Sequence, residues 1–185
     1  MDNINDNNTI NTLNVLTEYE IIDRDTTSEV LSFDELYSND AFLNEKNKFT
    51  LDLLNSIRND EPDDFYQSFA YNTFMEYYNK YGIAVGEWMN DILTCNLSNV
   101  AIVCGILKIL SFTEYNKLQS FARSMLMLCI FQYDKTPDIE VTEQIIKCIE
   151  NWNDKAFISI LNDLKINIAF LDFYRDQVLA DLQLN

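Results

Sequence analysis

The sequence has 185 residues, a length that fits one domain, with or without an appended arm, and that can bury a core without a metal or disulfide. Thirty acidic residues against thirteen basic ones give a net charge of −17, which repels nucleic acid phosphates and anionic lipid heads and attracts basic partners. The chain has no histidine, which removes Ser-His-Asp and Cys-His catalysis, histidine-ligated metals and the usual near-neutral general base.

Scarce glycine and proline indicate helices rather than sheets, because sheet proteins use both residues at tight turns; here there are three glycines and two prolines. The best candidate for a membrane span, Val100 to Leu110, contains Lys108 and is about half the ~18–20 apolar residues that span a bilayer. The first residues are polar and acidic, unlike a signal peptide. We therefore expect an all-α protein in the cytoplasm, without membrane contact.

The N-terminal third is predicted to hold a polar arm followed by acidic helices. Residues 1–11 are rich in Asn and Asp and are expected to form a flexible arm before a single helical domain over 12–185. The apolar spacing from Leu13 to Ile22 indicates a short helix. Ser32 and Glu35 match a capping box, which opens one interrupted or two shorter helices that end near Asn59.

An acidic link over residues 60–64 leads into an unusually aromatic helix, expected over about 65–81. Asp63 or Asp64 is suited to cap this helix. The eight aromatic residues of the helix cover more than one face, so some rings should lie outside the core. Gly82 follows where a left-handed residue is favoured at a helix end.

The remaining elements are predicted helices over about 84–95, 99–111, 113–133, 138–152, 154–165 and 168–182. Ser98 or Asn99 and Asp154 are suited to cap helices. Thr136-Pro137-Asp138 matches a cap followed by proline at the first helical position. Short links make neighbouring helices pack antiparallel, so 12–97 is predicted as acidic, aromatic-rich helices and 98–185 as stacked helical pairs with a C-terminal capping helix.

The segments Ser98–Tyr133 and Asp138–Lys165 resemble HEAT or armadillo-type helical-repeat proteins, in which stacked helix pairs share one core. The resemblance rests on Thr136-Pro137-Asp138, on the stripe of Ile145, Ile146, Cys148 and Ile149, and on the break over 151–154. It implies a protein-binding surface and usually no catalysis. A compact irregular helical bundle is the alternative fold.

Several kinds of catalytic and binding site are missing from the sequence. The glycines form neither of the two nucleotide-binding loops, and no calcium-binding loop is present. The cysteines show no C-x-x-C pair, so we expect no zinc or thioredoxin-type site and four reduced, buried thiols at Cys95, Cys104, Cys129 and Cys148. We predict a protein that is not an enzyme and holds no metal or cofactor.

The leading functional hypothesis is an inhibitor of a basic protein, most concretely an immunity protein that neutralises a toxin such as a nuclease domain. Carboxylates can fill the cationic cleft of such a toxin, with aromatic anchors around them. In size, acidity and lack of catalytic groups the chain is similar to small bacterial immunity proteins, including those of contact-dependent inhibition. The predicted partner-binding residues are Asp60, Glu61, Asp63, Asp64, Tyr66, Tyr71, Glu76, Tyr77 and Tyr78, with a second acidic set at Asp23, Asp25, Glu29, Asp34 and Glu35.

Other functions and plainer readings of the same features stay open. The alternative functions are a helical-repeat adaptor or scaffold that holds a peptide or subunit, and a nucleic-acid mimic that occupies a DNA-binding protein. Acidity can also serve solubility alone, the aromatic helix can be plain core, and the acidic link can be a solvated loop with a helix cap.

Overall fold

The computed structural model describes residues 40–60, 68–118 and 120–184, and in these ranges every regular element is a helix. This confirms the predicted all-α class. The chain divides into two compact units, Met1–Glu45 and Lys46–Asn185, and only residues 40–45 of the first are described. The expected boundary after residue 11, the helix from Leu13 to Ile22 and the capping box at Ser32 and Glu35 lie outside the described residues.

The observed helices fall close to the predicted ranges, with differences of a few residues at their ends. Two segments predicted as one helix each are divided: 154–165 is a 3₁₀ turn followed by a six-residue helix, and 113–133 contains the separate helices Tyr115–Leu118 and Ser120–Tyr133. The bounds are α2 Asp40–Asn59, α3 Phe69–Tyr81, α4 Ala84–Cys95, α5 Val100–Phe112, α6 Tyr115–Leu118, α7 Ser120–Tyr133, α8 Ile139–Trp152, η1 Lys155–Phe157, α9 Ile158–Asp163 and α10 Ala169–Leu184.

Side-chain caps fix several helix starts. The Asn99 side chain accepts from the Ile102 amide at 3.3 Å at the start of α5, as predicted. The Asp154 side chain accepts from the Ala156 amide at 2.9 Å before η1, also as predicted. Each of these bonds satisfies an amide that the first helical turn leaves without a partner.

Two predicted caps are wrong. Asp138, not Thr136, caps α8: its Oδ1 accepts from the amides of Glu140 and Val141, and the helix begins at Ile139. Pro137 therefore lies before the helix rather than at its first position. The aromatic helix α3 begins at Phe69, four residues later than predicted, and Ser68 caps it in place of Asp63 or Asp64. In both cases the side chain that caps the helix belongs to the residue directly before its first turn.

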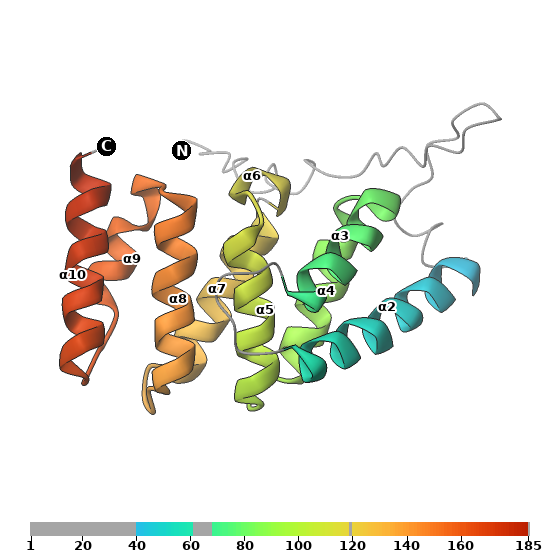
Figure 1. Cartoon of the computed structure of the whole chain (residues 1–185), viewed down its shortest axis with the longest axis horizontal. Coiled ribbons are helices and arrows are strands. Elements are labelled where there is room, and N and C mark those ends of the chain that lie inside the picture. Colours follow the sequence, from blue (N-terminus) through green and yellow to red (C-terminus); the bar gives the residue numbers. More distant parts are fainter. Residues whose placement is uncertain (1–39, 61–67, 119, 185) are drawn as a thin grey trace, which may run out of the picture. The chain divides into compact units, whose positions relative to one another are not determined.

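In the unit Lys46–Asn185 the helices alternate between two layers (Figure 1). One layer runs in the order α3, α5, α8 and α10, each packing against the next. The helices α4 and α7 pack against each other in the second layer, where α7 also contacts α5 and α8, and α9 packs against α10. The predicted pairing of 138–152 with 154–165 is not the packing seen, because α9 packs on α10; the stacked-pair arrangement of 98–185 stays a prediction.

The contact between α5 and α8 is the largest in this unit, and it is apolar on both sides. The α5 residues Ile102, Val103, Ile106, Leu107, Ile109 and Leu110 are buried, and α8 buries Val141, Ile145, Ile146 and Ile149. Burying one such side chain contributes about 1.5–3 kcal/mol relative to leaving it exposed. This interface therefore contributes strongly to the stability of the second half of the chain.

An aromatic cluster holds α2 against α3 and α4. The Phe49 ring, which is fully buried, lies 5.1 Å from the Tyr77 ring and 5.7 Å from the Trp88 ring. Further along α2, Ile57 packs so closely on α5 that a Cβ at Gly105 would lie 2.6 Å from its Cγ2. Only glycine fits at this crossing of α2 and α5.

The expected exposure of the cysteines is half right. All four are free thiols; Cys129 and Cys148 are buried as predicted, Cys104 is half-buried and Cys95 is exposed at the end of α4. The apolar neighbours of Cys95 predict a buried thiol, but Cys95 lies on the outer face of its helix. None of the described helices combines the length and apolar character needed to cross a membrane.

Candidate partner-binding site

A groove of about 470 Å³ lies between α2 and α3, within the unit Lys46–Asn185. Its walls come from the polar side of α2 and the facing side of α3. The residues that line it are Asp52, Asn55, Ser56, Asn59, Phe69, Thr73, Glu76 and Tyr77. The groove therefore presents hydroxyls, amides and carboxylates together with one exposed aromatic ring.

Two polar contacts join the groove's walls. The hydroxyls of Ser56 and Thr73 share a hydrogen bond of 2.7 Å, and the Tyr77 hydroxyl donates to Asp52 Oδ2 at 2.7 Å. These bonds hold the two helices in register on the polar side, while the Phe49 ring packs on Tyr77 behind them. The groove is thus built on rigid helices rather than on loops, which fixes its side chains in place.

The groove is anionic. Asp52 and Glu76 contribute two carboxylates, and no Lys or Arg is among the described residues that line it. The Glu76 side chain is exposed, and the Phe69 ring, 68% exposed, lies with it in the groove lining. A cation entering the groove would meet carboxylates and an aromatic face, the two groups that bind guanidinium and ammonium ions best.

The start of α3 fixes the position of Phe69. Its amide donates to Asp60 Oδ1 at 2.6 Å, and Ser68 accepts from the Tyr71 amide at 3.0 Å. The Asp60 carboxylate is thereby engaged at the helix start, and it also lines a second hollow between α5 and α8. Asp60 thus lies beside the groove without lining it.

The structure brings two of the predicted site residues into the groove, Glu76 and Tyr77. Tyr77 is only 7% exposed, so it offers the groove little beyond its hydroxyl. The ring of Tyr71 packs on Phe112 at 5.8 Å, and the Tyr78 hydroxyl donates to the Lys117 carbonyl at 3.0 Å. Both rings are half-buried against neighbouring elements and neither lines the groove.

The other predicted site residues cannot be placed. Nine of them lie outside the described residues, four in or near the acidic link and five in the first 39 residues: Glu61, Asp63, Asp64, Tyr66, Asp23, Asp25, Glu29, Asp34 and Glu35. Their assignment to a partner-binding surface stays a prediction.

Sequence reasoning missed most of the groove, including Asp52, Phe69 and Thr73. A signal was present on α2, where polar residues recur at positions 52, 55, 56 and 59 beside the buried stripe of Phe49, Leu53 and Ile57. Such a polar stripe is typical of a solvated face, and only the packing of α3 beside it makes it one wall of a groove.

The second hollow, about 350 Å³ between α5 and α8, differs in charge and chemistry. It is lined by both signs: Lys108 and Lys147 face Glu140 and Glu143, and Lys147 pairs with Glu143 at 3.1 Å. Burial and the carboxylates of Glu140, Asp138 and Glu143 raise the pKa of the Cys104 thiol there to about 12. The thiol therefore stays protonated at neutral pH and is a poor nucleophile.

Neither hollow contains an evident metal site: among the residues that the structure describes, no group of three His, Cys, Asp or Glu side chains could hold a metal ion.

Comparison with protein-family models, with curated proteins and with solved structures finds no match for this chain. The resemblances to helical-repeat proteins and to immunity proteins therefore stay predictions, and function has to be argued from the groove and the charge distribution.

Proposed function

We propose that this chain is a non-catalytic inhibitor that binds a basic protein, in the manner of an immunity protein that neutralises a toxin domain. The observation that carries the proposal is the groove between α2 and α3, whose described lining holds two carboxylates and an exposed ring and has no cation. A lysine or arginine side chain of the partner would enter this groove, between Glu76 and the Phe69 ring.

The distribution of charge along the sequence supports a basic partner. Residues 40–60, 68–118 and 120–184 contain eighteen acidic and twelve basic residues, whereas the rest of the chain contains twelve acidic residues and one base, Arg24. The described residues also include several acids in ion pairs, such as Asp91 with Lys46 at 2.7 Å and Asp134 with Lys165 at 2.8 Å. Most of the excess charge thus belongs to residues 1–39 and 61–67, which include most of the predicted acidic site.

The expected binding energetics follow from this arrangement. Long-range attraction between the acidic segments and a cationic cleft speeds association and weakens with salt. A cation over an exposed ring contributes about 0.5–1 kcal/mol, and a charge-assisted hydrogen bond to a carboxylate contributes more, about 1.5–3 kcal/mol. The groove would then slow dissociation, and the acidic segments would speed association.

The test is affinity capture from a lysate of the source organism, followed by binding kinetics with the captured partner. The bait proteins are the wild-type chain, the Glu76→Lys variant and the matched Glu114→Lys variant, which makes the same charge change at an exposed site outside the groove. We expect a basic partner whose association is salt-dependent and whose dissociation is at least about tenfold faster with Glu76→Lys than with Glu114→Lys.

Two outcomes would contradict the proposal. A neutral partner that stays bound equally well at about 0.5 M salt, where screening removes most surface attraction, would favour the adaptor function instead. Equal effects of the two lysine substitutions on the dissociation rate would show that the partner binds outside the groove. Charge reversal at Glu61, Asp63 and Asp64, which leaves the Asp60 bond to the Phe69 amide in place, gives a separate test of the acidic link, and we expect it to slow association at least about tenfold.

A further inference from the structure

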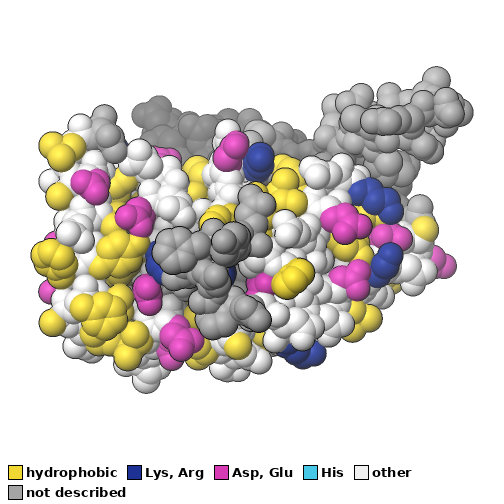
Figure 2. Space-filling view, in the orientation of Figure 1, with side chains coloured by type: hydrophobic (Ala, Val, Ile, Leu, Met, Phe, Trp, Pro, Cys, Tyr) yellow, Lys and Arg dark blue, Asp and Glu magenta, His cyan; other side chains and the backbone are white. Residues whose placement is uncertain are grey.

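The outer face of α10 carries an apolar stripe that no described residue covers. Phe170, Phe173 and Leu184 are 58%, 65% and 85% exposed, and Ala180 lies on the same face. Their spacing of three, seven and four residues keeps them on one side of the helix. Figure 2 shows hydrophobic side chains gathered over α10, interspersed with acidic ones. The exposed Gln177 interrupts the stripe between Phe173 and Ala180, so its apolar side chains form two groups on one face of the helix.

The opposite side of α10 is fixed in the core. Leu171, Val178, Leu179 and Leu182 are buried, and the helix packs against α8 and α9. In the order α3, α5, α8 and α10, the helices α5 and α8 each pack between two neighbours, whereas α10 packs against α8 alone in this layer. The stripe therefore lies where a further helix would continue the stack.

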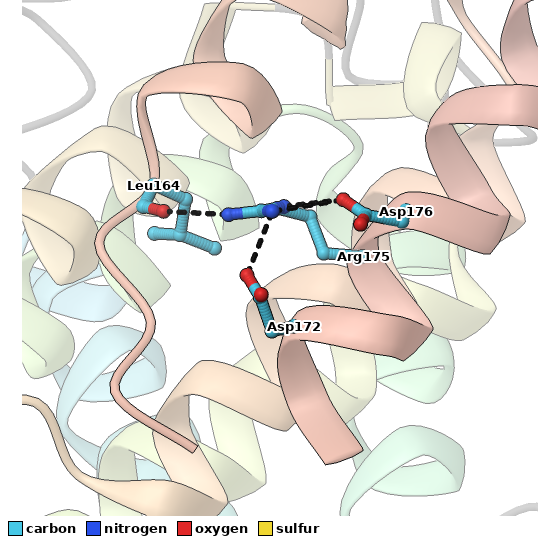
Figure 3. Close-up of polar contacts among 4 residues, drawn as sticks. All are labelled: Leu164, Asp172, Arg175 and Asp176. Atoms are coloured by element: carbon cyan, nitrogen blue, oxygen red, sulfur yellow. Dashed lines mark hydrogen bonds and ion pairs between the residues drawn. The ribbon is translucent and has the colours of Figure 1, made fainter. Parts of the chain in front are cut away.

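The charges beside the stripe are carboxylates. Asp176 flanks it on one side and Asp181 on the other, and both are exposed. Arg175 is the one base of α10, and its guanidinium is held within the protein. It pairs with Asp172 at 2.7 Å and Asp176 at 2.8 Å, and it donates to the Leu164 carbonyl (Figure 3).

Burial of Arg175 leaves the rim of the stripe negative. The Arg175 side chain is 19% exposed, whereas those of Asp172 and Asp176 are 48% and 61% exposed. An approaching surface meets these carboxylates before it meets the guanidinium. The face thus combines an apolar centre with an anionic border, which is complementary to an apolar stripe bordered by cations.

We propose that the outer face of α10 binds an amphipathic helix of another protein, whose apolar stripe is flanked by lysine or arginine. Two helices that dock in this way contact each other through apolar side chains spaced three, four or seven residues apart, as on the α10 stripe. The proposal concerns a different surface from the groove between α2 and α3 and stands independently of it.

Charge disfavours two other occupants. In a pair of α10 helices from two copies, antiparallel pairing about the midpoint between Asp176 and Gln177 places Asp176 near its own counterpart and Asp181 near Asp172. Parallel pairing again sets each acid against itself. The chain's own apolar segment Leu13–Ile22 is bordered by Glu18, Glu20 and Asp23, so it too would bring acids onto acids.

The test uses the full chain and three labelled peptides of roughly 18 residues, long enough to form a helix. One has a leucine stripe flanked by lysine, the second carries glutamate in place of lysine, and the third is a scramble of the first. We expect the lysine peptide to bind at least about tenfold more tightly than the scramble, and the Phe170→Ser/Phe173→Ser variant to lose that preference. Leu51→Ser, at an exposed leucine of α2, is the matched control and should keep it.

A second experiment reverses the charges at the border of the stripe. Because Asp176 and Asp181 form the anionic border, Asp176→Lys/Asp181→Lys should reverse the preference toward the glutamate peptide. Equal binding of the lysine peptide to wild type and to the serine variant would overturn the proposal. So would a wild-type dimer, measured by light scattering, that the serine variant splits, or tighter peptide binding after Leu13→Ser/Leu16→Ser, since these would assign the face to a second copy or to the chain's own segment.

Discussion

The groove between α2 and α3 and the outer face of α10 are both accessible surfaces, but they are formed in different ways. The groove needs two helices, because its hydroxyl pair, its Tyr77–Asp52 bond and its carboxylates come from both walls. The α10 face needs one helix, because its apolar stripe and its acidic border follow from the spacing along Ala169–Leu184. Perturbing the core should therefore damage the groove, whereas the stripe should tolerate substitution without loss of stability.

The strongest way to break the groove is to remove the ring behind it. Phe49→Ala should lower the free energy of unfolding by about 3–5 kcal/mol, because the ring is fully buried between Tyr77 and Trp88 and its loss leaves a cavity. Urea unfolding followed by far-UV circular dichroism measures this. The control is Leu51→Ala on the exposed side of α2, and an equal loss from the two variants would contradict the assigned packing.

Gly105→Ala tests the contact that positions the end of α2. Alanine would gain about 1 kcal/mol in helix propensity, but its Cβ would lie 2.6 Å from Ile57 Cγ2, and relieving such overpacking costs about 1–3 kcal/mol. We expect net destabilisation of up to about 2 kcal/mol in urea unfolding. Ile57→Ala should make room for the new methyl, so the double variant should be more stable than the sum of the single changes predicts.

Tyr77→Phe tests one polar link of the groove with the ring stack left in place. Losing the bond to Asp52 should lower the free energy of unfolding by about 0.5–1.5 kcal/mol, because Asp52 is partly exposed and water can take the place of the hydroxyl. A cycle of Tyr77→Phe, Asp52→Ala and the double variant isolates the pair. Strict additivity of the two single changes would show that the bond contributes nothing.

The smallest effect is expected on the α10 stripe. Phe173→Ala should change the free energy of unfolding by no more than about 0.5 kcal/mol, because the ring is 65% exposed and has little packing to lose. The matched core variant on the same helix is Leu171→Ala, where a buried side chain is removed and about 2–5 kcal/mol is expected. A large loss from Phe173→Ala would mean that something in the folded protein already covers the ring.

The sequence predicted elements better than it predicted contacts. Asn99 and Asp154 were identified as caps because a cap is a local event between residues two or three apart. Thr136 was wrong, since Thr136 and Asp138 can each cap a helix and the choice depends on where α8 meets α5. For Tyr71, Tyr77 and Tyr78, spacing predicted that some rings of the helix would be exposed. It did not identify Phe69, the most exposed of the described rings of that helix.

The sequence by itself determined that the described chain is helical and where most of the helices lie, because apolar periodicity is a local property of one or two turns. Its composition also excluded histidine chemistry. Tertiary structure alone decided that a polar stripe on α2 lines a groove, that the Arg175 guanidinium reaches the Leu164 carbonyl, and that Gly105 must lack a side chain. Each of these depends on which helices become neighbours. Which helices become neighbours depends on the apolar surface that the whole unit buries, and a short stretch of sequence does not contain that information.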